Sequence, residues 1–125
     1  MSERRKDPRT SASRSLGNWL EHCKSKLSTS LVLANDDGLL IEERGAGDKA
    51  ELLAAYASYS GWEHKRDNNV PSFLREEIQE TTENHHLSVH PIEIKNAKVF
   101  LVCQSDKELP EQEVDSVCDG VRRIL

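Results

Sequence analysis

The fold is decided by one stretch, residues 31–41, which reads LVLANDDGLLI. Two short apolar runs flank Asp36, Asp37 and Gly38, and glycine supplies the positive φ that tight hairpin turns require. Acidic residues before a glycine are ordinary turn residues, so we assign Asp36 and Asp37 no catalytic role. The stretch therefore predicts two antiparallel strands joined by a tight turn.

Amphipathic helices are predicted on both sides of this hairpin. Before the hairpin, apolar residues recur at helical spacing over residues 15–27, and Ser15 can cap that helix. The apolar stripe consists of Leu16, Trp19, Leu20, Cys23 and Leu27. After the hairpin, a second helix is predicted over residues 48–60, where Asp48 and Glu51 have the spacing of a capping box.

The helix predicted over residues 48–60 has more apolar surface than one core contact uses. One stripe consists of Ala50, Leu53, Ala54 and Ala57, and a neighbouring stripe consists of Leu52, Tyr56 and Tyr59. One stripe can face the sheet, so the other needs a partner. We therefore predict a dimer interface formed by Leu52, Tyr56, Tyr59 and Trp62.

The secondary structure of the middle of the chain, residues 61–82, is the least clearly indicated by the sequence. Residues 61–72 contain breakers such as Pro71 and are predicted to be a loop. Residues 73–82 are open to two interpretations. Leu74 and Ile78 have the spacing of a helix, whereas the polar stretch that begins at Ile78 suits an edge strand.

Two further strands and a helix are predicted in the C-terminal part. Residues 87–94 alternate, with a change of parity at Pro91 that predicts a β-bulge. Residues 99–103 are apolar on both faces, which is typical of a central strand. A helix begins at Pro110. Its apolar face consists of Val114, Val117, Cys118, Val121, Ile124 and Leu125. An antiparallel sheet with flanking helices, an α+β fold, is the economical packing of these elements.

Composition predicts one small cytoplasmic domain. A chain of 125 residues with 36% hydrophobic and 31% charged residues has enough material for one core. No apolar run approaches the roughly 18 residues of a membrane span, and no signal peptide is evident. The net charge of −5 disfavours nucleic-acid binding by the folded part, because an acidic body repels phosphates.

Residues 1–14 are predicted to be a basic, disordered tail in front of a domain over residues 15–125. The tail contains five basic and two acidic residues and no apolar periodicity, so it cannot offset its ordering entropy alone. Its basic residues are candidates for docking a partner. They include Arg4, Arg5, Lys6 and Arg9.

No sequence motif for catalysis or cofactor binding is found, so we expect no enzyme activity, no cofactor and no metal. The three cysteines, Cys23, Cys103 and Cys118, are predicted to be buried reduced thiols. In a strand His86 and His90 share a face with Ser88, whereas His85 points the other way. Two imidazoles do not complete a zinc site, so we interpret them as exposed polar residues.

Residues 31–41 and the alanine-rich stretch over residues 48–57 resemble the first half of a roadblock (dynein light chain) domain, of the bacterial type. The resemblance implies a profilin/longin-type antiparallel sheet of about five strands, flanked by three helices. Two of these helices lie on one face and the alanine-rich helix lies on the other. It also implies dimerisation through the alanine-rich helix and the middle strand.

The same resemblance implies a non-enzymatic function. Its members scaffold or regulate Ras-like GTPases, dynein or lysosomal signalling complexes, and bacterial relatives act on polarity GTPases. We therefore expect a homodimer, or a pair with a related chain, that regulates a small GTPase. One alternative is a scaffold subunit that pairs with another roadblock-like or larger protein and has no GTPase contact. A second alternative is a module that binds a nucleotide or a metal.

Overall fold

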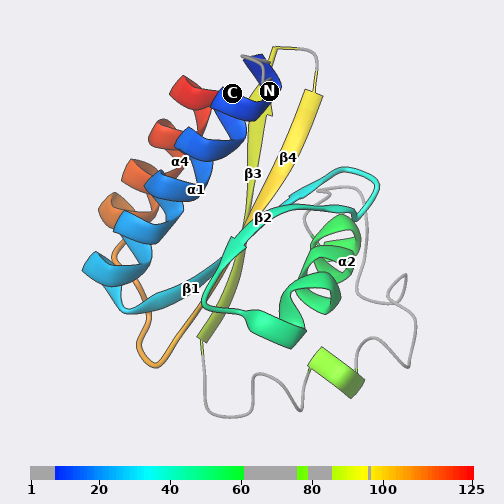
Figure 1. Cartoon of the computed structure of the whole chain (residues 1–125). Coiled ribbons are helices and arrows are strands. Elements are labelled where there is room, and N and C mark those ends of the chain that lie inside the picture. The colour runs from blue at the N-terminus through cyan, green and yellow to red at the C-terminus, as the bar shows by residue number, and fades with distance from the viewer. Residues whose placement is uncertain (1–7, 61–75, 79–85, 96) are drawn as a thin grey trace.

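The computed structural model describes residues 8–60, 76–78, 86–95 and 97–125. Its elements follow the predicted order of helix, hairpin, helix, hairpin, helix (Figure 1). They are α1 (Pro8–Leu27), β1 (Thr29–Asn35), β2 (Leu40–Arg44), a 3-10 turn (Gly47–Lys49), α2 (Ala50–Ser60), β3 (His86–Ile94), β4 (Ala97–Ser105) and α4 (Glu111–Ile124). None of the helices in these ranges is long and apolar enough to cross a membrane.

The described strands form an antiparallel sheet of four strands in the order β2-β1-β4-β3. β1 and β4 are central, and β1 pairs with β4 along the whole length of β1, from Thr29 opposite Ser105 to Asn35 opposite Val99. The predicted count was about five strands. Residues 76–78, inside the undecided segment 73–82, are helical, and the rest of that segment lies outside the described residues.

The hairpin turn forms as predicted, and Asn35 holds it together. The Asn35 side-chain Oδ1 accepts hydrogen bonds of 2.9 Å from the backbone N–H groups of Asp37 and Leu39. Gly38 has a φ of +86°, the conformation that a side chain would strain. Asp36 and Asp37 are exposed at this turn, as turn residues should be.

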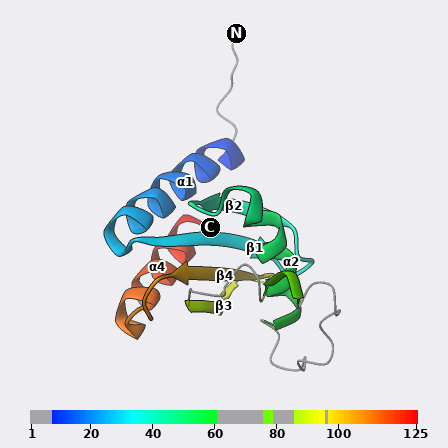
Figure 2. The ribbon, with the colours of Figure 1, turned by 90° about the horizontal axis from the view of Figure 1, so that it is seen from below.

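The sheet separates two hydrophobic cores, because β1 and β4 are apolar on both faces. Figures 1 and 2 show α1 and α4 on one face and α2 on the other. Leu31, Leu33 and Leu101 point into the core under α1 and α4. Val32 and Phe100 point into the second core, under α2. The helix arrangement implied by the resemblance is therefore present.

The predicted β-bulge at Pro91 is wrong. β3 pairs with β4 in one continuous register, with Pro91 opposite Phe100. The change of parity has another cause: Leu87 and Val89 pack on the α2 core, whereas Ile92 is buried in the core under α1 and α4. A sheet with a core on each face can bury both parities of one strand without a bulge.

The predicted start of the first helix was too late. α1 begins at Pro8, so residues 8–14, assigned from the sequence to the disordered tail, are helical, and Ser15 lies inside the helix instead of capping it. Proline is favoured in the first turn, and residues 9–14 contain no helix breaker, so the helix can extend beyond its apolar stripe. Residues 1–7 lie outside the described residues.

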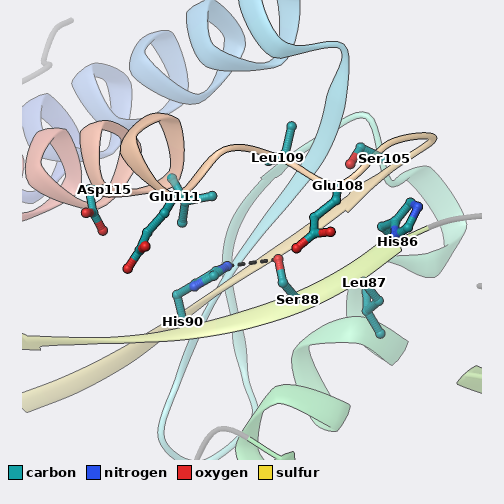
Figure 3. Close-up of a pocket in the computed structure, with 10 residues that line it drawn as sticks. His86, Leu87, Ser88, His90, Ser105, Glu108, Leu109, Glu111 and Asp115 are labelled. Carbon is teal, nitrogen blue, oxygen red and sulfur yellow. Dashed lines mark hydrogen bonds between the residues drawn. The ribbon is translucent and has the colours of Figure 1, made fainter.

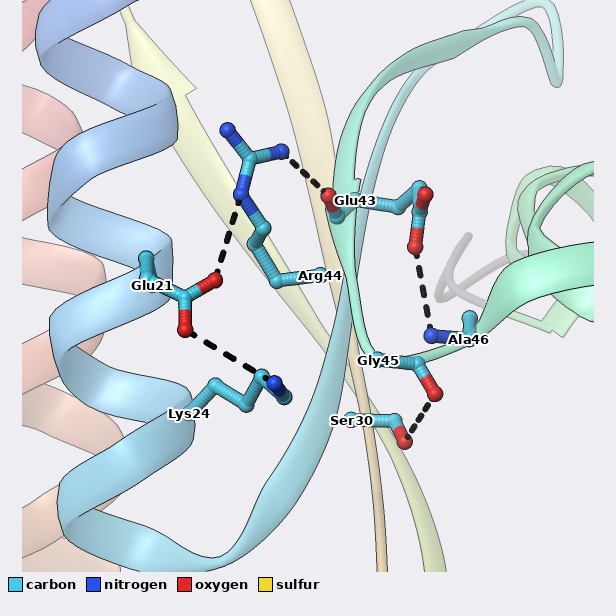
Figure 4. Close-up of polar contacts among 7 residues, drawn as sticks. All are labelled: Glu21, Lys24, Ser30, Glu43, Arg44, Gly45 and Ala46. Carbon is cyan, nitrogen blue, oxygen red and sulfur yellow. Dashed lines mark hydrogen bonds and ion pairs between the residues drawn. The ribbon is translucent and has the colours of Figure 1, made fainter.

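Polar contacts join β2 to α1 at the end of the hairpin (Figure 4). Arg44 Nε lies 3.5 Å from Glu21 Oε1, and Arg44 Nη1 lies 3.4 Å from Glu42 Oε2. Ser30 Oγ donates a 3.0 Å hydrogen bond to the Gly45 carbonyl, which directs the chain away from β2 toward α2. Exposed ion pairs contribute at most about 1 kcal/mol each, so these contacts orient the elements more than they stabilise them.

A close contact between helices joins Trp19 on α1 to Gly120 on α4. The Trp19 indole Nε1 donates a 3.0 Å hydrogen bond to the Val117 carbonyl, and the indole ring lies against the glycine. A Cβ placed on Gly120 would collide with Cε2, Cζ2 and Nε1 of this ring. Glycine at this position is therefore required by packing and not by backbone conformation.

We predict that Gly120→Ala destabilises the protein, although alanine is normally better than glycine inside a helix by about 0.5–1 kcal/mol. The added methyl group has to displace the Trp19 ring, and overpacking of this kind costs about 1–3 kcal/mol. Urea unfolding measures the change. Ser116→Ala, at an exposed position of the same helix, is the control and should be neutral or slightly stabilising. A Gly120→Ala variant as stable as the control would contradict this packing.

Candidate functional site

The predicted interface helix buries one of its two apolar stripes. Ala50, Leu53, Ala54 and Ala57 are all buried against the sheet. Leu52 and Tyr56, from the neighbouring stripe, pack against the edge of that core and stay partly exposed. The side chain of Tyr59 and the whole of Trp62 lie outside the described residues. Whether the four residues form an interface stays a prediction.

The α2 face of the sheet carries additional apolar surface at β3. α2 lies over β1, β4 and β2, whereas the opposite face has two helices. Leu87 and Val89 of β3 also pack at the edge of the α2 core and are half-buried. We call four of the five half-buried apolar side chains at the edge of this core, all except Ala46, the α2 surface. They are Leu52, Tyr56, Leu87 and Val89.

A groove lies on the opposite face, between β3 and the beginning of α4 (Figure 3). As predicted, His86, Ser88 and His90 share one face of the strand, and all three line the groove. The sequence did not indicate the other wall, which comes from the β4–α4 loop and α4. Its lining includes Glu108, Leu109, Glu111, Val114 and Asp115. The groove has a volume of about 640 Å³.

His90 is held in this groove by a hydrogen bond and is half-buried. Its Nε2 lies 2.8 Å from Ser88 Oγ, and the two groups are hydrogen-bonded. Burial lowers the pKa of His90, and the nearby carboxylate of Asp115 opposes that change. The imidazole is therefore mostly neutral at neutral pH, although it faces acidic residues.

The groove does not assemble a metal site from the residues that the structure describes. No group of three or more His, Cys, Asp and Glu side chains among them is arranged to hold a metal ion. His86 and His90 are separated along the strand by Ser88, whose hydroxyl bonds to His90. His85 lies outside the described residues.

The three cysteines are buried free thiols, as predicted, and all belong to the core under α1 and α4. Burial raises the pKa of Cys103 to about 12 and that of Cys118 to about 11. The thiolate is the reactive form of cysteine, so these side chains are poor nucleophiles at neutral pH.

The predicted partner-docking tail is only partly described. Arg9 lies in the first turn of α1, and its side chain is not among those the structure describes. Arg4, Arg5 and Lys6 lie outside the described residues. Their docking role stays a prediction.

We predict that His90 makes the protein less stable in acid. Because the pKa of His90 is lowered in the folded state, the unfolded chain binds a proton more readily. Stability is therefore fully present above the ordinary histidine pKa of about 6.5 and is lost as the pH falls through the lowered folded value. Urea unfolding at about pH 8 and about pH 5 measures this loss. His90→Asn should reduce the loss, and an identical pH dependence in both proteins would refute the assignment.

Comparison with known proteins supports the assignment of the fold alone. No family model matches the sequence, and no curated protein matches it. Among solved structures, the chain is similar to Myxococcus xanthus MglB with a TM-score of 0.56. The match covers 99% of this chain and 93% of that chain, at 11% sequence identity. The chain therefore has a roadblock-like fold, as residues 31–41 and 48–57 predict by their resemblance.

Proposed function

We propose that the protein is a non-enzymatic, dimeric adaptor that regulates a small Ras-like GTPase in a cytoplasmic signalling or polarity complex. The observation that carries the proposal is the roadblock-like fold, which extends over nearly the whole chain. A fold limits the function only to a broad class, so the finer parts of the proposal rest on the surfaces and side chains of this protein.

The α2 surface supports the dimeric part of the proposal. Its side chains leave apolar area at the edge of the core that α2 and Ile78 cover. Burying such area against a second copy is worth roughly 25 cal/mol per Å² before the entropic cost of association. Leu52 and Tyr56 come from a helix and Leu87 and Val89 from a strand, so a twofold contact could combine elements from both protomers.

The chemistry of the described side chains supports a regulator that contributes no reacting group. The thiols are buried with raised pKa values, and Asp36 and Asp37 belong to a hairpin turn. An adaptor can change the rate of GTP hydrolysis by ordering the switch loops of the GTPase, without supplying a residue itself. The expected partner is then a nucleotide-loaded GTPase and not free GTP.

We predict that Leu52→Glu converts a dimer into a monomer. The new carboxylate would have to be buried without a partner in the contact, which is strongly unfavourable. Sedimentation equilibrium should give twice the 14.1 kDa chain mass for the unchanged protein and a value near that mass for the variant. Lys49→Gln, at an exposed neighbouring position, changes the net charge equally and should remain dimeric.

A second variant keeps this prediction testable if Leu52→Glu does not fold. Val89→Glu places the same charge on β3, outside the helix, and thermal unfolding verifies that each variant is folded. A folded variant of either kind that still sediments as a dimer would show that the α2 surface is not the interface.

We predict that immobilised protein retains a purified Ras-like GTPase in one nucleotide state only. The GTPase would be loaded with GDP or with a non-hydrolysable GTP analogue, because the two ligands hold its switch loops differently. The protein alone should not hydrolyse GTP. A dimer that retains no GTPase in either state would favour the alternative, a scaffold subunit that pairs with another protein without GTPase contact.

A further inference from the structure

The groove between β3 and α4 concentrates carboxylates that have no cationic partner in the described structure. Glu108 comes from the β4–α4 loop, and Glu111 and Asp115 come from α4 (Figure 3). Among the described residues, no lysine or arginine forms an ion pair with any of the three. Glu21 and Glu42 each pair with Arg44, whereas Asp36 and Glu51, which lie outside the groove, form no ion pair with a described lysine or arginine either.

The helix dipole at the beginning of α4 explains the position of only one of these carboxylates. A carboxylate in the first turn, such as Glu111, is stabilised by the helix dipole. Glu108 precedes the helix and Asp115 follows its first turn, so the dipole accounts for neither position. The β4–α4 loop and the packing of α4 together place these two residues on the same groove as Glu111.

His90 does not cancel this negative charge at neutral pH. His90 donates to or accepts from Ser88 and is held mostly neutral by burial. His86 is exposed at the other end of the groove. A positively charged group that enters the groove therefore meets three carboxylates and no described lysine or arginine in the lining.

Apolar side chains make the groove suited to more than a simple ion. Val114 is buried beneath it, and Leu109 is half-buried in its lining. An arginine combines a long apolar stem with a planar guanidinium, which can hydrogen-bond to two carboxylates at once. These properties match the lining, which contains both apolar and acidic side chains around a volume of about 640 Å³.

We propose that this groove docks an arginine-bearing segment of a partner protein. The segment presents its guanidinium to Glu108, Glu111 and Asp115 and rests its neighbouring apolar side chains on Leu109 and Val114. This second docking surface lies on the α1 and α4 face of the sheet, opposite the α2 surface, so one adaptor could bind two partners at once.

The test uses the full-length protein and a synthetic peptide with one central arginine flanked by leucines. Its twin carries citrulline, which has nearly the same shape as arginine but no charge. Fluorescence anisotropy measures affinity, and backbone amide NMR shifts locate the peptide. We expect the arginine peptide to bind with shifts centred on Ser88, Leu109 and Asp115, and the citrulline peptide to bind at least about fivefold more weakly.

Matched variants distinguish specific binding in the groove from a general attraction of the peptide to an acidic protein. Glu108→Gln combined with Asp115→Asn should weaken binding by about five- to tenfold, because it removes two charge-assisted contacts. Asp36→Asn combined with Glu51→Gln removes the same charge from exposed positions outside the groove and should change affinity by less than about twofold.

Several outcomes would overturn the proposal. They are equal binding of the citrulline peptide, equal losses in the two double variants, shifts centred on the α2 surface, and no binding. Free arginine amide that binds as tightly as the peptide would also overturn it, because the site would then recognise a small cation and not a protein segment. None of these outcomes depends on dimerisation or on GTP hydrolysis, so the proposed function is tested separately.

Discussion

The structure depends on one constraint, which is that the central strands β1 and β4 are apolar on both faces. Leu31, Leu33 and Leu101 require cover on one side, and Val32 and Phe100 require it on the other. A sheet of this kind cannot leave a face in water, so helices must lie on both sides of it. The three-layer order of the molecule follows from this requirement (Figure 2).

The two faces satisfy the constraint differently. On one face, α1 and α4 pack closely enough for the Trp19 ring to occupy the place of a side chain at Gly120. On the other face, α2 packs its small residues on the sheet, Ile78 from the helical residues 76–78 is buried in the same core, and Leu52, Tyr56, Leu87 and Val89 stay half-buried at its edge. The proposed dimer would bury these four half-buried side chains.

The face covered by α1 and α4 carries a groove where α4 begins. β3 extends past the region that α4 covers, so His86, Ser88 and His90 line a groove instead of a core. The loop after β4 brings Glu108 to this groove, and the first two turns of α4 bring Glu111 and Asp115. The two surfaces of interest are thus on opposite faces of one thin sheet.

The sequence by itself determined the elements and their burial, because periodicity and turn chemistry are local. Residues 31–41 specified the hairpin with its Asn35 turn, and the stripes over residues 48–57 and 114–121 specified which faces of α2 and α4 are buried. The local patterns gave two wrong predictions, and in both the reason lies outside the pattern itself. The parity change at Pro91 reflects two cores and not a bulge, and α1 extends to Pro8 beyond its apolar stripe. Only the tertiary structure decided the contact between Trp19 and Gly120 and the carboxylates that face His90, because these residues are far apart in sequence and packing alone brings them together.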